Sequence, residues 1–138
     1  MASKKRKRST RVFVSRRADL NIRVMLERRQ ITKNPSTGLV RHGQHVVWEF
    51  ENHIGAHTVA VVGDFQRLPA TTEGHPVPDW PFVDPPPWAL AVVPKGRKAK
   101  VRLRVKDKHW KLSGLHRYSY SIGCPQVGSD PEIVIEWP

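Results

Sequence analysis

Basic residues occupy every second position from Lys98 to Lys106, and this spacing suits contact with a polyanion. In an extended strand they would share one face, with one charge every ~6.6 Å, close to the separation of successive phosphates along a stretched nucleic-acid strand. Such contacts bind the backbone through counterion release and without base preference. Alternatively, the charges keep an edge strand soluble by preventing edge-to-edge pairing. The candidate residues are Lys98, Lys100, Arg102, Arg104 and Lys106.

A second basic segment lies near the start of the chain and comprises Lys4, Lys5, Arg6, Lys7 and Arg8. Residues 1–10 are small, polar and cationic, so we expect a disordered tail that adds flexible phosphate contacts. No apolar segment of the signal-peptide type follows these charges. We therefore expect a cytoplasmic protein, or a nuclear one if the source is eukaryotic, because the tail also fits a nuclear-import signal.

Charge is segregated along the 138 residues, whose formal net charge is +12. Residues 1–41 hold 13 Lys/Arg against 2 acids, and residues 95–117 hold 10 against 1. This distribution favours nucleic acid or another polyanion as the partner. No apolar run approaches the ~18 residues of a membrane span, so no membrane partner is expected. A single cysteine, Cys124, excludes an intramolecular disulfide.

Four histidines lie between residues 42 and 57, where His42 and His45 are three apart and His53 and His57 are four apart. They could form an adventitious zinc or nickel site, although exposed loop histidines are the favoured interpretation. The sequence has no GxSxG elbow, no Walker loop, no HExxH motif and no obvious acid/base pair. We expect neither enzymatic activity nor a cofactor.

Two-residue alternation of apolar and polar side chains predicts short strands through most of the chain. In residues 20–26 the aliphatic positions also fit a helix, but a strand is preferred because the alternation is strict. Turn residues recur every 8–15 positions, so the strands predict a sandwich or barrel. The inward-facing positions would include Val46, Trp48, Phe50, Val101, Leu103, Val105, Tyr118, Tyr120, Ile122, Ile133, Ile135 and Trp137.

Residues 75–94 are rich in proline yet contain four large apolar side chains, Trp80, Phe82, Trp88 and Leu90. A solvated linker would not carry that much apolar surface, so we expect an ordered crossover over one edge of the sandwich. The Pro78–Pro81 spacing could also dock into an aromatic groove of another protein. An alternative function follows, a protein–protein adaptor or assembly subunit in which Trp80, Trp88 and Trp137 form one exposed apolar patch.

Two segments resemble the cupredoxins. The segment from Val46 to Val59 ends a strand at Asn52 and opens the next one with His57-Thr58-Val59. The segment from Tyr118 to Cys124 is similar to the aromatic strand that leads to the copper-binding cysteine of that family. The turn Val93–Gly96 also fits the family pattern. The resemblance implies an all-β Greek-key sandwich over residues 11–138, preceded by the tail of residues 1–10.

The resemblance also implies that His57 and Cys124 occupy two vestigial copper-ligand positions. A blue-copper centre needs two imidazoles and a thiolate, and the chain has neither histidine nor methionine after Cys124. The nearby Gln126 is no substitute for an imidazole. We therefore expect no metal and a copper-free, non-enzymatic cationic binding module. A residual copper-handling role at His57 and Cys124 is the third alternative.

Overall fold

The computed structural model describes residues 19–138. Residues 1–18, which include the predicted tail and its basic side chains, lie outside the described residues. The described part forms the strands β1 (Leu20–Leu26), β2 (Ile31–Asn34), β3 (Thr37–Arg41), β4 (His45–Asn52), β5 (Thr58–Arg67), β6 (Val77–Pro78), β7 (Trp88–Val93), β8 (Lys98–Arg104), β9 (Gly114–Cys124), β10 (Val127–Ser129) and β11 (Glu132–Trp137). It contains no helix long and apolar enough to span a membrane.

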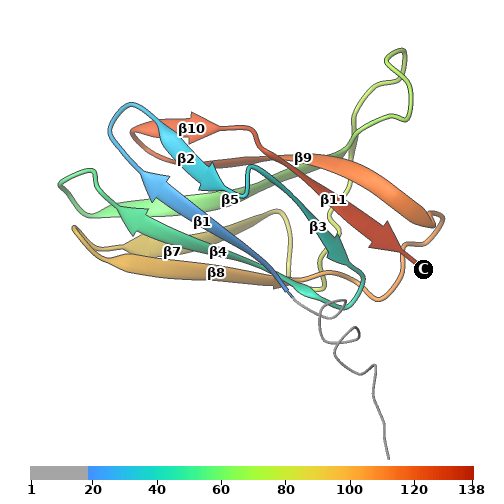
Figure 1. The fold of residues 1–138 in the computed structure, drawn as a ribbon, viewed down its shortest axis with the longest axis horizontal. Coiled ribbons are helices and arrows are strands. Elements are labelled where there is room, and N and C mark those ends of the chain that lie inside the picture. The colour runs from blue at the N-terminus through green and yellow to red at the C-terminus, as the bar shows by residue number, and fades with distance from the viewer. Residues whose placement is uncertain (1–18) are drawn as a thin grey trace, which may run out of the picture.

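The strands form two sheets that pack face to face (Figure 1). The first sheet has the order β2-β1-β4-β8, and the second runs β3-β11-β9-β5-β6, with β7 also paired to β5 and β10 to β9. The neighbours β1 and β4 are parallel, as are β3 and β11, while the other pairs are antiparallel. The chain passes from the first sheet to the second between β2 and β3, so the two sheets are interlocked by their connections.

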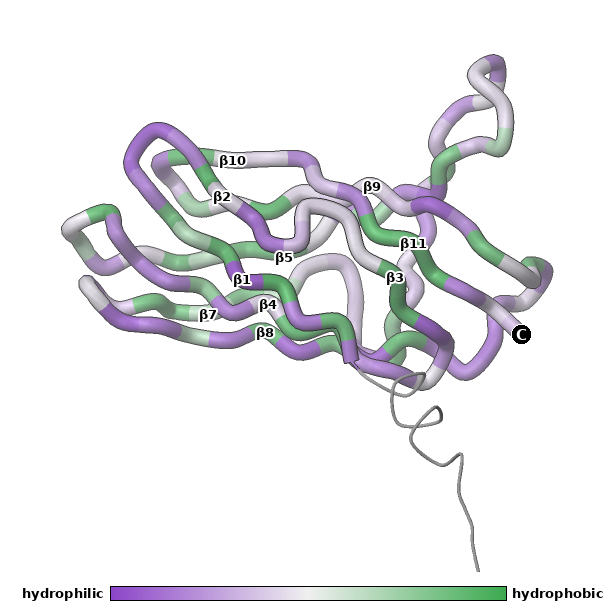
Figure 2. Tube along the Cα trace, viewed as in Figure 1, coloured by the Kyte–Doolittle hydropathy of each residue, from purple (hydrophilic) through white to green (hydrophobic). Residues whose placement is uncertain are grey.

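Apolar alternation accounts for the strands and their inward faces. In β1 the side chains of Ile22, Val24 and Leu26 are buried while their neighbours point outward, so the strand prediction is confirmed and the helical alternative is wrong. The same pattern holds in β4, β8, β9 and β11, where the residues predicted to face inward are buried. The loop between β5 and β6 instead projects from the sandwich and is mostly hydrophilic (Figure 2).

An aromatic cluster fills the centre of the core between the sheets. Trp48 of β4 is edge-on to Phe65, Phe82 and Tyr120, with ring centroids 5.6–6.3 Å apart. Phe65 and Tyr120 stack at 4.8 Å. Such pairs stabilise a core beyond the apolar area they bury. Burial raises the pKa of Tyr120 to about 12, although the hydrogen bond from Trp48 opposes this.

The segment 75–94 differs from its prediction in its second half. Residues 88–93 are a strand, β7, which pairs with β5 along its whole length. The alternation that places Ala89, Ala91 and Val93 toward the core was readable, but the surrounding prolines masked it. The first half is an ordered crossover as predicted, since Phe82 is buried and Trp80 packs on the core.

A polar cluster fastens this crossover to the sandwich. One oxygen of Asp79, Oδ2, accepts hydrogen bonds from Tyr118 Oη at 2.8 Å and from His109 Nε2 at 2.9 Å. The other ring nitrogen, Nδ1, accepts backbone N–H groups of Lys111 and Leu112, both at 3.2 Å. Since Nδ1 accepts, Nε2 carries the proton that is donated to Asp79. Burial, with the bond to Asp79, raises the pKa of Tyr118 well above its ordinary value.

Candidate polyanion-binding face

Strand β8 forms one edge of the first sheet and carries the predicted row of cations on its outer face. Val101 and Leu103 point into the core, whereas Lys98, Lys100 and Arg102 are exposed. The predicted alternation is therefore confirmed. The edge position of β8 is the one that the alternative interpretation, solubility of an edge strand, assumes. Lys106 is exposed but lies beyond the end of β8, where its backbone N–H donates to Pro81.

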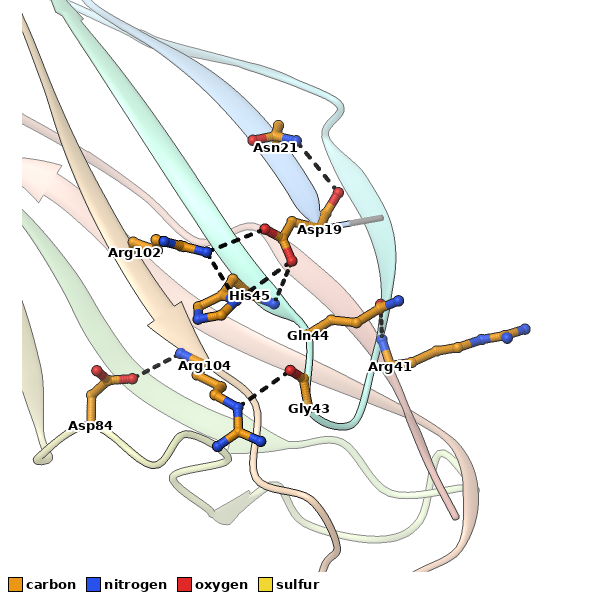
Figure 3. Close-up of polar contacts among 9 residues, drawn as sticks. All are labelled: Asp19, Asn21, Arg41, Gly43, Gln44, His45, Asp84, Arg102 and Arg104. Carbon is orange, nitrogen blue, oxygen red and sulfur yellow. Dashed lines mark hydrogen bonds and ion pairs between the residues drawn. The ribbon is translucent and has the colours of Figure 1, made fainter. Parts of the chain in front are cut away.

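Arg102 is held by an acidic residue from the start of β1 (Figure 3). Its Nη2 lies 3.7 Å from Asp19 Oδ2 and donates to His45 Nδ1 at 3.3 Å. Asp19 Oδ1 accepts the backbone N–H of His45 at 3.0 Å. Because a guanidinium only donates, Nδ1 of His45 is the acceptor in this contact. Asp19 thus neutralises part of the charge that Arg102 would offer to a polyanion.

Arg104 has a structural role at the end of the same strand. Its Nη2 forms a 2.7 Å ion pair with Asp107, and its Nε donates to the carbonyl of Gly43 at 3.3 Å. Its backbone N–H donates to Asp84 at 2.8 Å. Figure 3 shows the contacts of Arg104 with Gly43 and Asp84. Arg104 therefore secures the turn before β4 and is poorly placed to bind a phosphate.

Two carboxylates on β4 face the remaining cations of β8. The antiparallel register sets Glu49 opposite Lys100 and Glu51 opposite Lys98. Cross-strand neighbours of opposite charge attract each other, so the outer face of the sheet is mixed in charge. In the sequence, Glu49 lies 51 residues before Lys100 and Glu51 lies 47 residues before Lys98, so only the pairing of β4 with β8 shows that they are neighbours. The available signal in the sequence was that Glu49 and Glu51 alternate with Trp48 and Phe50, which predicts that the two carboxylates point outward.

The excess positive charge lies mainly in the first 18 residues. They hold eight of the 24 Lys/Arg and none of the 12 acids, so residues 19–138 have a net charge of only +4. The tail residues Lys4 to Arg8, and Arg11, Arg16 and Arg17, lie outside the described residues. The folded sandwich alone is therefore a weaker attractor of polyanions than the whole chain.

The histidines that the sequence placed near one hairpin are separated by the length of β4. His42 and His45 lie before or at its beginning, and His53 and His57 lie beyond its end. His53 Nε2 is 3.4 Å from Glu51, and His57 Nδ1 accepts the backbone N–H of Lys95 at 2.9 Å. The zinc or nickel site that would join the four residues is therefore not formed.

The vestigial copper-ligand positions lie at the same end of the sandwich as His53. Cys124 ends β9, is partly buried and packs against the core. Gln126 contacts Thr58, with Oε1 and Oγ1 3.2 Å apart. Within residues 19–138 no group of three or more His, Cys, Asp or Glu side chains could hold a metal ion.

The tryptophans do not form the apolar patch expected of the adaptor alternative. Trp137 is only 2% exposed, so it belongs to the core. Trp80 is partly buried, and its Nε1 donates to the carbonyl of Asp84 at 2.6 Å. Of these three tryptophans, Trp88 alone is substantially exposed, at 46%. The predicted patch was wrong because Trp137 alternates with Glu136 and follows the inward face of β11.

No family model matches the chain, and no curated protein matches it in sequence. Among solved structures, the CsuC-CsuE chaperone–tip adhesion subunit pre-assembly complex of Acinetobacter baumannii aligns with a TM-score of 0.57 and 12% identity, over 75% of this chain and 50% of that one. McoA multicopper oxidase of Aquifex aeolicus aligns with a TM-score of 0.48 and 14% identity, over 86% and 30%. Auracyanin of Roseiflexus castenholzii aligns with a TM-score of 0.42 and 11% identity, over 86% and 98%.

These similarities concern the fold alone, and the chain spans about half or less of the first two structures. The described strands form two facing sheets, as in a β-sandwich, and cupredoxins are among the solved structures that align with the chain. The predicted fold class, all-β and cupredoxin-like, is confirmed.

Proposed function

We propose that the protein is a non-enzymatic module that binds nucleic acid or another polyanion. The observation that carries the proposal is the segregation of charge: residues 1–18 hold eight basic side chains without an acid, next to a sandwich of net charge +4. A cationic segment of this kind attracts phosphate backbones by releasing their condensed counterions. The N-terminal segment would therefore supply most of the affinity.

The outer face of β8 would supply a second, weaker set of contacts. Lys98 and Lys100 are exposed, and neither forms an ion pair within the part of the chain that the structure describes. Glu49 and Glu51 oppose them across the strand pair, so a bound phosphate has to compete with these carboxylates. Arg102 and Arg104 contribute less, because Asp19 and Asp107 already contact them.

The test is binding of a fluorescent 20-nucleotide single strand of DNA, and of RNA of the same length, at ~50 mM salt, where phosphate contacts are strongest. The proposal requires measurable affinity that is insensitive to base sequence, since phosphate contacts carry no sequence information. Undetectable binding of both strands at this salt concentration would show that the proposal is wrong.

A further inference from the structure

The outer face of the second sheet carries a groove that the polyanion proposal does not use. Its volume is ≈ 860 Å³, within the range typical of ligand sites. One side consists of Val59, Val61 and Trp88, from β5 and β7. The opposite side is the turn from Cys124 to Ser129, which includes β10. The groove thus lies across the sheet, on the opposite side of the sandwich from the outer face of the first sheet.

The floor of the groove is shaped by glycines. The ring of Trp88 lies directly where a Cβ of Gly63 would be, so the indole rests flat on the backbone of β5. A Cβ at Gly123 would come within 2.8 Å of the carbonyl oxygen of Val127, so only glycine lets β10 approach β9 this closely. Trp88 is therefore held in place even though 46% of its surface is exposed.

Beside the groove, β7 carries a row of exposed apolar side chains in line with Trp88. Leu90 and Val92 are 65% and 70% exposed, and they pair across the strands with Val61 and Val59. Their spacing is that of alternate residues in an extended chain. An apolar surface this long is better matched to an extended peptide than to a compact small molecule.

Two carboxylates converge beside the groove: Asp130 lines it, and Asp64 lies with Asp130 and Ser121 in a smaller adjoining hollow. The hydroxyl of Ser121 lies 3.5 Å from Asp64 Oδ2 and 3.3 Å from Asp130 Oδ1. A serine hydroxyl has one proton, so it donates to only one of them at a time. The only other side-chain donor to either carboxylate among the described residues is Gln66 Nε2, 3.4 Å from Asp64 Oδ1.

The charge of these carboxylates is not neutralised by an ion pair among the described residues, a feature they share with Glu27, Glu49, Glu73 and Asp84. Neither forms an ion pair within residues 19–138, whereas pairs with Arg or His are formed by Asp19, Glu51, Asp79, Asp107, Glu132 and Glu136. A guanidinium or ammonium group would supply the missing N–H donors and charge. The face of Trp88, which also lines the groove, can hold the stem or the charge of the same side chain.

We propose that this groove binds an extended peptide segment of a partner protein in which an arginine or lysine adjoins apolar side chains. The apolar residues pack on Val59, Trp88 and Leu90, and the cationic group lies between Asp64 and Asp130. The sheet and charges used here differ from those of the polyanion-binding proposal, so either can fail without the other.

The probe is the capped hexapeptide Val-Ser-Val-Ser-Arg-Ser, whose valines and arginine share one face of an extended chain. It is added to the ¹⁵N-labelled full chain, and binding is followed by NMR. We expect chemical-shift changes at the indole of Trp88 and the amides of Ser121 and Gly123, and saturable binding. Two matched peptides should bind at least tenfold more weakly, one with glutamate for arginine and one with serine for valine. Binding of all three with equal affinity, or of none at 1 mM (roughly the weak limit of specific recognition), would overturn the proposal.

The test variant is the double substitution Asp64→Asn and Asp130→Asn. The control variant is Glu73→Gln. Asparagine tolerates the positive φ of 55° at position 64, so the double variant should fold, which its melting temperature checks. We expect at least a tenfold loss of peptide affinity in the double variant, and no change in the control, because Glu73 lies in an exposed loop. DNA binding should not fall in either variant. If arginine methyl amide binds as tightly as the hexapeptide, the groove takes a small organic cation and the peptide proposal is wrong.

Discussion

Trp48 and Tyr120 are joined across the core by a hydrogen bond of 3.0 Å, from the indole Nε1 of one sheet to the phenol oxygen of the other. Both side chains are buried, and their rings meet edge to face at 5.6 Å. A buried indole N–H needs an acceptor, because leaving it without one costs its full desolvation energy. The pair therefore fixes how the two sheets sit against each other as well as filling space between them.

Replacing Trp48 with alanine should lower the free energy of unfolding by ~3–5 kcal/mol, because a large cavity would open in the core. Such a loss is a large part of the stability of a domain of this size. Tyr120→Phe is a smaller change, because it keeps the ring and removes only the oxygen that accepts the hydrogen bond from Trp48. We expect it to lower the free energy of unfolding by ~1–3 kcal/mol. Urea denaturation followed by circular dichroism measures both. A Trp48→Ala variant that unfolds at the wild-type urea concentration would mean that the register of β4 is off by one residue.

Stability should decline in alkaline solution as Tyr120 ionises. Burial raises its pKa to about 12 in the folded protein, against 10.0 as the ordinary value. The folded state holds the proton that the unfolded chain loses, so this contribution is complete below pH 10 and disappears as the pH rises through about 12. Denaturation at pH 9 to 12 (about the span of the two pKa values) should show a steeper fall for the wild type than for Tyr120→Phe. Equal slopes in both proteins would contradict a buried, protonated Tyr120.

The inward faces of the strands could be predicted because their signal is local. Side chains alternate between the two faces of a strand, so the sequence alone determines which residues of β4 or β9 share a face, whichever strand lies beside it. What could not be predicted depends on partners remote in the sequence. Lys100 opposite Glu49 follows from the β4–β8 register, and Asp64 beside Asp130 follows from the β5–β9–β10 arrangement. Asp79 similarly meets His109 and Tyr118 only after the crossover has folded.

The protein should form no blue-copper centre. His57 and Cys124 match two ligand positions, but between Cys124 and Pro138 there is no second histidine to complete the trigonal set and no methionine to serve as axial ligand. One equivalent of Cu(II) added to the reduced protein should give no intense charge-transfer band near ~600 nm, the mark of a copper–thiolate bond. Cys124→Ser is the matched control. A strong band in the wild type that this variant lacks would restore an electron-transfer role.

Binding of single-stranded DNA should weaken steeply with salt, by a log–log slope of ~0.7 for each phosphate contacted. Removing residues 1–10 deletes Lys4, Lys5, Arg6, Lys7 and Arg8, so the slope should fall by up to about 3.5, five contacts at ~0.7 each. The melting temperature should hardly change, since the sequence predicts a tail that packs on nothing. Fluorescence anisotropy at several salt concentrations measures the slope.

Lys100→Gln tests the outer face of β8 in the same assay. Glutamine is preferred to glutamate, because a carboxylate opposite Glu49 would add a repulsion unrelated to DNA. We expect the slope to fall by ~0.7, which corresponds to the loss of one phosphate contact. The charge-matched control is Arg29→Gln, at an exposed position in the hairpin between β1 and β2. If Lys100→Gln and Arg29→Gln have the same effect, the face of β8 makes no specific contribution and the N-terminal segment alone accounts for binding. If deletion of residues 1–10 also leaves the slope unchanged, charge segregation does not explain binding and the polyanion proposal is wrong.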